Sequence, residues 1–284
     1  MFELILENAA GDQINFAQNS AFTITEIEGL NPPDATINTS ETALMDGAKF
    51  NSSKLNMRNI NVAFAIEYQA AKNRLEVFKV LKSKQWVKMS YIGQYRQVFI
   101  EGYIESIDIS YFEMKQIVTC SILCPSPYFK DAQMIVNELL NVVGAFHFPF
   151  ASTEDPELVF SYINTDIGVV IQNDGDIDCG MIIELYAKYA VSNPKIFNYI
   201  TREYIGLNFD MQQSDLITID TRQGQKSVTL LRGGVESNIF NSVIPGSTWL
   251  QLSANGDTFV YEVGTGSAGD LSLTFKHYNL FEGV

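Results

Sequence analysis

Apolar and polar side chains alternate with a period of two along much of this chain. The segment NINVAFAIEY (59–68) has an apolar residue at every second position, from Ile60 to Tyr68. Successive side chains of a β-strand point to opposite faces, so this alternation predicts a strand with one buried face. The segment QIVTCSILC (116–124) is apolar on both faces and predicts a second strand.

The second half of the chain repeats short apolar runs at close intervals. Between residues 167 and 276, β-branched and aromatic runs are separated by Gly, Asn, Asp and Pro. Short strands divided by turn residues are typical of a β-sandwich. The runs are IGVVIQ, MIIELYA, LITID, KSVTLL, TWLQL, TFVYEV and LSLTF.

One stretch of the first half has the spacing of a helix instead. In AAKNRLEVFKVLKSKQ (70–85), apolar residues recur at intervals of three or four, with lysines between them. This pattern predicts an amphipathic helix over about residues 70–84. The residues expected to face the core are Ala71, Leu75, Phe78 and Leu81.

The same helix and its exit carry a basic cluster that is opposed only by Glu76. Such a cluster is usually a solvated helix face. The alternative is contact with an acidic partner, which includes an acidic surface of another copy of the chain. The candidate contact residues are Lys72, Lys79, Lys82 and Lys84.

Charge divides the chain near residue 128. Residues 1–128 carry 11 basic and 14 acidic side chains, a net −3, whereas residues 129–284 carry 8 and 19, a net −11. The break coincides with Pro125 and Pro127, which cannot take part in a regular central strand. We therefore expect two domains, residues 1–130 and 131–284, the first mainly β with the helix and the second a β-sandwich.

The total charge of −14 argues against a nucleic-acid surface, because phosphate neutralisation needs excess Lys and Arg. The N-terminal segment lacks the basic start and apolar run of an export signal, so secretion by signal peptide is not expected. No apolar run approaches the roughly 20 residues of a membrane span, so membrane insertion is not expected either.

Residues with catalytic or metal-binding chemistry are few. The chain has two histidines, His147 and His277, and three cysteines, Cys120, Cys124 and Cys179. A histidine triad, a zinc site and a disulfide framework are therefore not expected. The sequence predicts no enzyme, no metal and no cofactor.

Asp174, Asp176 and Asp178 have the spacing of the first ligands of a calcium loop. The pattern then fails, because position six is Cys179 and position twelve is Leu185. The preferred interpretation is a hairpin turn at Asp174-Gly175, since Asp-Gly favours two-residue connections between antiparallel strands.

The order of several motifs resembles the distal tail proteins of long-tailed bacteriophages. One motif is QIVTCSILCPSPYF (116–129), which looks like the closing strand of the family's first domain followed by a Pro-Tyr motif. The others run from IQNDGDIDCG (171–180) through SNPKIFNYITREY and DLITIDTRQGQKSV to STWLQL, TFVYEV and YNLFEGV. The motif residues are Pro125, Pro127, Tyr128, Asp174, Gly175, Asn193, Pro194, Asp220, Thr221 and Gly224.

This resemblance implies a structural function. Proteins of the family form a hexameric ring at the baseplate hub, with the ring made by the first domain and a galectin-like sandwich in the second. The ring joins the tail tube protein on one side and the tail-associated lysin or tail fibre hub on the other, and receptor-binding proteins can attach. The implied location is the tail tip of the virion, after assembly in the bacterial cytoplasm.

The resemblance also accounts for the polar segment IDTRQGQ (219–225). It implies a turn between two strands, in which Asp220 and Thr221 cap a strand end and Gly224 supplies a positive φ. The alternative function is that of a carbohydrate-binding adhesin, because sugars bind to exposed aromatic side chains beside polar groups. The aromatic residues proposed for that role are Trp249, Tyr261 and Tyr278.

Overall fold

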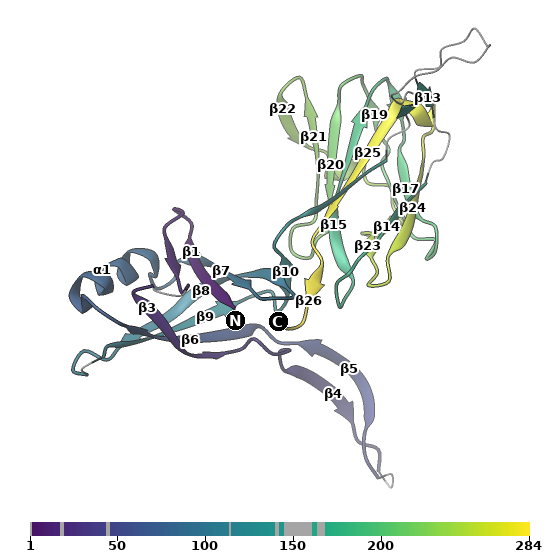
Figure 1. Cartoon of the computed structure of the whole chain (residues 1–284). Coiled ribbons are helices and arrows are strands. Elements are labelled where there is room, and N and C mark those ends of the chain that lie inside the picture. Colours follow the sequence, from purple (N-terminus) through teal and green to yellow (C-terminus); the bar gives the residue numbers. More distant parts are fainter. Residues whose placement is uncertain are drawn as a thin grey trace, which may run out of the picture. The chain divides into compact units, whose positions relative to one another are not determined.

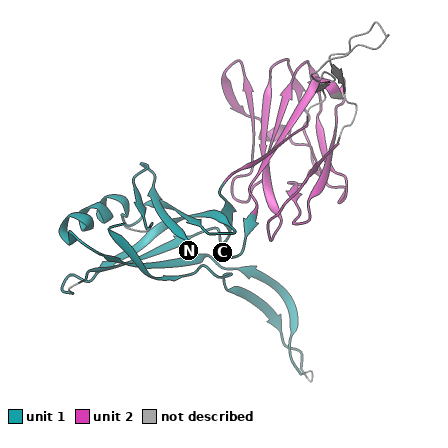
Figure 2. Ribbon diagram, in the orientation of Figure 1, with its two compact units in different colours: residues 1–132, 280–284 teal, residues 133–279 magenta. Residues whose placement is uncertain are grey.

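The computed structural model divides into two compact units, shown in Figures 1 and 2. Unit 1 is Met1–Ala132 with Leu280–Val284, and unit 2 is Gln133–Asn279. The structure describes residues 2–17, 20–43, 46–113, 115–139, 142–144, 161–163 and 168–284. Within these residues the fold is mainly antiparallel β with one α-helix, as the sequence predicted. No helix in these ranges is long and apolar enough to cross a membrane.

Unit 1 is built on a nine-stranded sheet whose long path has the order β2-β1-β7-β8-β9-β6-β3. Two short strands, β10 and β26, pair with each other, and β10 also pairs with β8. The bounds are β1 (Glu3–Asn8), β2 (Gln13–Asn15), β3 (Phe22–Glu28), β6 (Arg58–Ile66), β7 (Trp86–Ile92), β8 (Gln97–Ile109), β9 (Ile117–Cys124), β10 (Phe129–Asp131) and β26 (Leu280–Phe281).

Alternation along the strands of unit 1 produces its core. In β6, Ile60, Val62 and Phe64 are buried, and the residues between them are more accessible. The ring of Phe64 meets that of Phe16 edge-to-face at 4.9 Å between centroids, and that of Phe22 at 5.7 Å. Edge-to-face packing suits the opposite charges of ring face and ring edge.

The helix α1 (Ala70–Val80) closes one side of this core, but with a different face from the one the sequence predicted. It buries Val77 and Val80, while Leu75 is 67% exposed and Phe78 is 38% exposed. Leu81 is buried as predicted, but the prediction was wrong for Ala71, Leu75 and Phe78. The helix carries two apolar stripes on roughly opposite sides, and periodicity alone does not rank them. The helix also ends at Val80 rather than near residue 84, because Leu81 is extended.

A two-stranded ribbon projects from unit 1, as Figure 1 shows. It consists of β4 (Ala35–Ser40) and β5 (Lys49–Leu55), which pair only with each other among the described strands. Nearly all of its side chains are exposed.

Unit 2 contains two main sheets. The larger has the order β11-β25-β15-β20-β21-β22, with β23 added to β15, and the smaller has the order β14-β24-β17-β18. The larger sheet comprises β11 (Ile135–Leu139), β15 (Cys179–Ala187), β20 (Leu216–Asp220), β21 (Ser227–Arg232), β22 (Val235–Asn238), β23 (Gln251–Leu252) and β25 (Leu271–His277). The smaller comprises β14 (Gly168–Ile171), β17 (Lys195–Asn198), β18 (Tyr204–Gly206) and β24 (Asp257–Glu262).

The two main sheets of unit 2 share one core. Phe259 of β24 stacks on Phe275 of β25, with ring centroids 5.3 Å apart. Both rings are buried, so the sheets pack face to face as in a sandwich. The remaining elements are short: β12 (Val142–Gly144) with β13 (Ser161–Ile163), β16 (Val191–Ser192) with β19 (Asp210–Met211), and the 3-10 turns η1 (Phe240–Ser242) and η2 (Ala268–Asp270).

Unit 2 is inserted between two neighbouring strands of unit 1. The chain leaves unit 1 after β10 and returns at β26, where Phe281 pairs with Phe129. The sequence assigned residues 131–284 to the second domain, but Leu280–Val284 belong to unit 1, because Phe281 is buried in the core of that unit. That the two parts are separate domains stays a prediction.

Candidate interaction surfaces

The basic cluster of α1 lies at the surface of unit 1. Lys72, Lys79, Lys82 and Lys84 are all exposed. Lys79 forms an ion pair with Asp12, and its ammonium hydrogen bond lowers the pKa of that carboxyl. Because this pair is exposed, it contributes little to stability, and the lysines remain accessible to a partner.

Apolar side chains surround the same face. Leu75 and Phe78 are one helical turn apart and both are exposed. Tyr111 and Phe112, in the loop between β8 and β9, are also exposed. The guanidinium of Arg74 lies 5.2 Å from the centroid of the Tyr111 ring, so the loop lies next to the helix. We call Leu75, Phe78, Tyr111 and Phe112 the helix patch.

The β4–β5 ribbon also exposes apolar side chains. Ile37 is 62% exposed and Phe50 is 60% exposed. Phe50 pairs across the ribbon with Thr39, two residues from Ile37, so Ile37 and Phe50 share a face. Lys49 pairs with Ser40, and Lys54 pairs with Thr36, which places both lysines on the other face. The ribbon therefore has an apolar face and a basic face.

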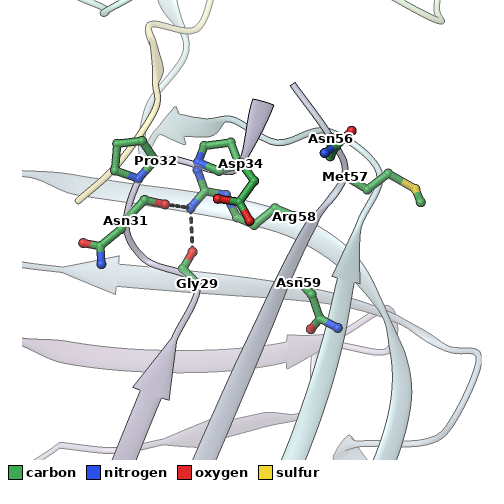
Figure 3. A pocket seen from close by; sticks show the side chains of 9 residues that line it. Gly29, Asn31, Pro32, Asp34, Asn56, Met57, Arg58 and Asn59 are labelled. Carbon is green, nitrogen blue, oxygen red and sulfur yellow. Dashed lines mark hydrogen bonds between the residues drawn. The ribbon is translucent and has the colours of Figure 1, made fainter. Parts of the chain in front are cut away.

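A cavity of about 320 Å³ lies at the root of the ribbon, and Figure 3 shows its lining. Arg58 reaches into this region with a side chain that is only 2% exposed. Its guanidinium donates hydrogen bonds to backbone carbonyls, and burial lowers its pKa. The acceptors are the carbonyl oxygens of Gly29, Asn31, Pro127 and Glu282.

Arg58 thereby explains part of the Pro-Tyr motif. The carbonyl of Pro127 accepts the Nε–H of Arg58 at 2.7 Å, and the guanidinium stacks over Phe129 at 4.6 Å. Arg96 secures the chain end in the same way, donating to the Gly283 carbonyl at 2.6 Å and stacking over Phe281 at 4.0 Å. Tyr128 is half-buried, which raises its pKa, and Pro125 is exposed. These contacts fix the C-terminal residues on unit 1.

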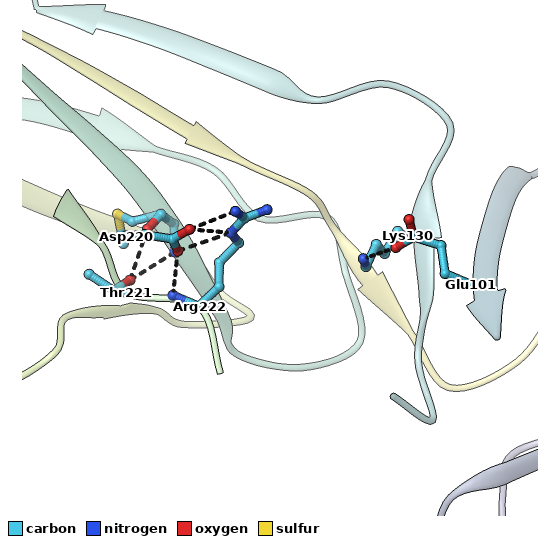
Figure 4. A network of polar contacts seen from close by, with 6 residues as sticks. Glu101, Lys130, Asp220, Thr221 and Arg222 are labelled. Atoms are coloured by element: carbon cyan, nitrogen blue, oxygen red, sulfur yellow. Dashed lines mark hydrogen bonds and ion pairs between the residues drawn. The ribbon is translucent and has the colours of Figure 1, made fainter. Parts of the chain in front are cut away.

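The polar segment around Asp220 is a structural turn, drawn in Figure 4. Thr221 is fully buried; its Oγ1 donates to the Met181 carbonyl at 3.0 Å and accepts the Met181 N–H at 2.9 Å. Asp220 accepts hydrogen bonds from the backbone and guanidinium of Arg222. Gly224 has a φ of 77°, a conformation that glycine adopts without strain. Asp220 and Thr221 therefore have structural partners within the turn.

Unit 1 holds a comparable ion pair, also drawn in Figure 4. Lys130 Nζ lies 2.5 Å from Glu101 Oε2, joining β10 to β8, the strand with which it pairs. The ammonium of Lys130 also lies 5.6 Å from the centroid of the Phe99 ring. This pair adds a side-chain contact to the backbone pairing of β10 with β8.

The hairpin turn predicted at Asp174-Gly175 is not formed, so this prediction was wrong. The strands on either side, β14 and β15, belong to different sheets and do not pair. The connection between them crosses from one sheet to the other, and Asn173 accepts the Gly175 N–H at 2.9 Å. Asp-Gly was a misleading signal because two-residue turns require strands that pair. Asp178 accepts the Ala254 N–H, so its carboxylate has a structural partner.

Asn193 and Pro194 form a second tight connection, between β16 and β17. Asn193 has a φ of 50°, in the left-handed region where asparagine is tolerated. Its backbone N–H donates to the Phe209 carbonyl, and the Pro194 carbonyl accepts the Leu207 N–H. These bonds position the start of β17.

The aromatic residues proposed for sugar contact do not gather at one place. Tyr261 is 2% exposed, and its hydroxyl donates to the Leu271 carbonyl, so it is a core residue and the assignment to a surface site was wrong. Tyr278 and Trp249 are half-buried. Trp249 stacks on Phe240, with centroids 5.6 Å apart. Alternation along the strand could have placed Tyr261 inside, since it follows the buried Phe259 by two residues.

The residues with metal-binding potential are also dispersed. In the described ranges no group of three or more His, Cys, Asp and Glu could hold a metal ion. Cys120, Cys124 and Cys179 are buried, which raises the pKa of each thiol to about 12. His277 is buried, and His147 lies outside the described residues.

Comparison with known families identifies unit 2. Residues 174–277 match the family of the siphovirus-type tail component, C-terminal domain. This part of the chain is similar to the C-terminal domain of that family. The match covers most of the sandwich and confirms the resemblance to the distal tail proteins. No curated protein matches the chain.

Solved structures extend the likeness to the fold of the whole chain. The crystal structure of SPP1 Dit, described as a paradigm of hub adsorption apparatus in Gram-positive infecting phages, aligns with a TM-score of 0.68 and 11% identity over 98% of this chain and 99% of that chain. A chain of the phage P2 baseplate in its activated conformation with Ca aligns with a TM-score of 0.54 and 12% identity over 100% of both chains. The same baseplate with Sr gives 0.51 and 12% over 97% and 98%.

Proposed function

We propose that this chain is a structural distal tail protein that forms a hexameric ring at the baseplate hub. The ring links the tail tube to the tail-tip proteins, which include the lysin or tail fibre hub and receptor-binding proteins. The observation that carries the proposal is the alignment with SPP1 Dit over nearly the whole of both chains, together with the family match of residues 174–277. The role is architectural rather than catalytic, and the location is the virion tail tip.

The surface of unit 1 supports a ring. The ribbon has unpaired outer edges within the described residues, and exposed strand edges tend to pair with other chains. The side chains of the helix patch and of the apolar face of the ribbon are exposed in the single chain, so a neighbouring copy can bury them. A head-to-tail contact between different surfaces of one chain generates a closed ring when the rotation permits closure.

Light scattering of the purified full-length chain, followed by negative-stain imaging, tests this proposal. A mass of about six protomers and a ring with a central hole are expected. A chain that stays monomeric alone and also in the presence of its tail tube protein would overturn it. Co-sedimentation with that tube protein is the matching test of the partner.

A second candidate function, glycan binding by unit 2, rests on the stacked pair Phe240 and Trp249. Phe240 is exposed, Trp249 is half-buried, and the ammonium of Lys226 lies 5.6 Å from the Trp249 ring. An aromatic surface beside a polar group is the usual composition of a sugar site. A glycan array probed with the wild type and with Trp249→Ala tests it; equal signals would remove this candidate.

A further inference from the structure

The two apolar stripes of α1 are the starting point. Val77 and Val80 are buried in the core of unit 1, whereas Leu75 and Phe78 lie on roughly the opposite side of the helix. Surface helices normally have only one apolar stripe. Tyr111, whose ring lies against Arg74 of the helix, and its neighbour Phe112 add exposed aromatic side chains to Leu75 and Phe78. Exposed apolar areas of this kind mark protein interaction sites.

The rim of the helix patch has a definite charge. Lys72 and Lys79 follow one side of the exposed stripe, and Arg74 follows the other. Arg74 is held by the Tyr111 ring and by Gln116, whose Oε1 lies 3.4 Å from Nη1. A surface that covers this patch must therefore be apolar at its centre and acidic at its edge.

The β4–β5 ribbon has that composition. Its apolar face carries Ile37 and Phe50, and its lysines lie on the opposite face. Glu41 and Asp46, both exposed, lie in the connection at its tip. A two-stranded ribbon with no further support is only marginally stable in water, so a binding surface would stabilise it.

The ribbon and the helix patch belong to one chain but lie on different sides of unit 1. Figure 1 shows the ribbon leaving the body of unit 1 on a side away from α1, so the ribbon does not cover its own helix patch. We infer that the ribbon of one copy binds the helix patch of the next, with Phe50 against Leu75 and Phe78, and the acidic tip near Lys72 and Lys79. This inference rests on the proposed ring and specifies its interface.

Disulfide trapping tests the contact in the full-length chain. The double variant Phe50→Cys with Leu75→Cys is oxidised and run on a non-reducing gel. Each copy then carries both halves of the contact, so a ladder of cross-linked oligomers is expected. The native cysteines are buried with raised thiol pKa values and should not compete. The control is Phe50→Cys with Ile200→Cys, which places the second thiol at an exposed position of unit 2.

The outcomes separate this inference from the ring itself. A ladder in the test variant alone supports the contact. Rings formed by the wild type without a ladder in the test variant, or equal ladders in test and control, overturn the contact and leave the ring proposal standing. A ladder without closed rings keeps the contact and overturns the ring. Monomers without a ladder, both alone and in the presence of the tail tube protein, overturn both.

Charge exchange provides an independent test. Lys72→Glu with Lys79→Glu should weaken self-association at least about tenfold by equilibrium sedimentation, and Glu41→Lys with Asp46→Lys should do the same. Combining all four changes in one chain should restore much of the lost self-association. The charges are then reversed on both surfaces, so the two surfaces attract each other again. Additive losses in the combined variant would contradict the proposed pairing.

Discussion

The Asp220 turn of unit 2 and the helix patch of unit 1 use residues in opposite ways. The turn buries polar side chains, and Thr221 is fully enclosed with both hydrogen bonds of its hydroxyl made. The patch exposes apolar side chains such as Leu75. Buried polar groups that are all paired belong to the fold, whereas exposed apolar groups without cover indicate assembly. The polar residues of the Asp220 turn therefore serve the fold, whereas the exposed apolar residues of the helix patch are available for contact.

The largest effect is expected where a buried polar group holds several segments together. Arg58→Met removes a guanidinium that serves four backbone carbonyls and leaves those carbonyls unpaired. The free energy of unfolding of unit 1 should fall by about 3–5 kcal/mol, because several buried acceptors lose hydrogen bonds to a charged group. Urea unfolding followed by a probe in unit 1 measures this loss. Arg202→Met, at an exposed position, is the control, and an equal change in both variants would contradict the role of Arg58.

The two stripes of α1 can be compared directly. Val77→Ala should destabilise unit 1 by about 2 kcal/mol through lost burial and a residual cavity. Leu75→Ala should change stability by less than about 0.5 kcal/mol, because its side chain is already in water. Chemical denaturation of both variants under conditions that favour monomers checks the pair. The reverse order would restore the helix orientation that periodicity predicted.

The turn in unit 2 should respond to the loss of a single hydroxyl. Thr221→Val keeps the shape of the side chain but leaves the Met181 N–H without its acceptor, and should cost about 1–3 kcal/mol. Thr274→Val, on a half-exposed position of β25, serves as the matched control. Thermal unfolding of unit 2 measures both. Equal melting temperatures would mean that the backbone bond from Thr221 to Met181 suffices.

The smallest effect concerns pH. Arg232 donates hydrogen bonds to Asp215 and lowers the pKa of its carboxyl below the ordinary value. This pair therefore stabilises the fold above the unfolded pKa of about 3.9, and the contribution is lost as pH falls through the lower folded value. Asp215→Asn should have a shallower loss of stability on acidification below about pH 4. Parallel pH profiles of the two proteins would refute this assignment.

The sequence by itself determined the classes of element and the family. Alternation of apolar residues in β6, turn residues between short runs and the order of the motifs led to a mainly β chain with one helix and to the distal tail proteins. These signals are local, because strand faces and turn preferences depend on neighbouring residues. Asp220, Thr221 and Gly224 were correctly placed at a turn for the same reason.

Only the tertiary structure decided which of several apolar surfaces became the core. Leu75 and Val77 lie two residues apart on one helix. Val77 is buried and Leu75 is exposed, because the sheet covers one side of α1 and not the other. Asp174-Gly175 has the composition of a hairpin, but its flanking strands found partners in separate sheets. The C-terminal residues return to unit 1 because Arg58, Arg96 and the core pocket around Phe281 receive them. Each of these outcomes depends on contacts between segments far apart in the chain, which no local pattern contains.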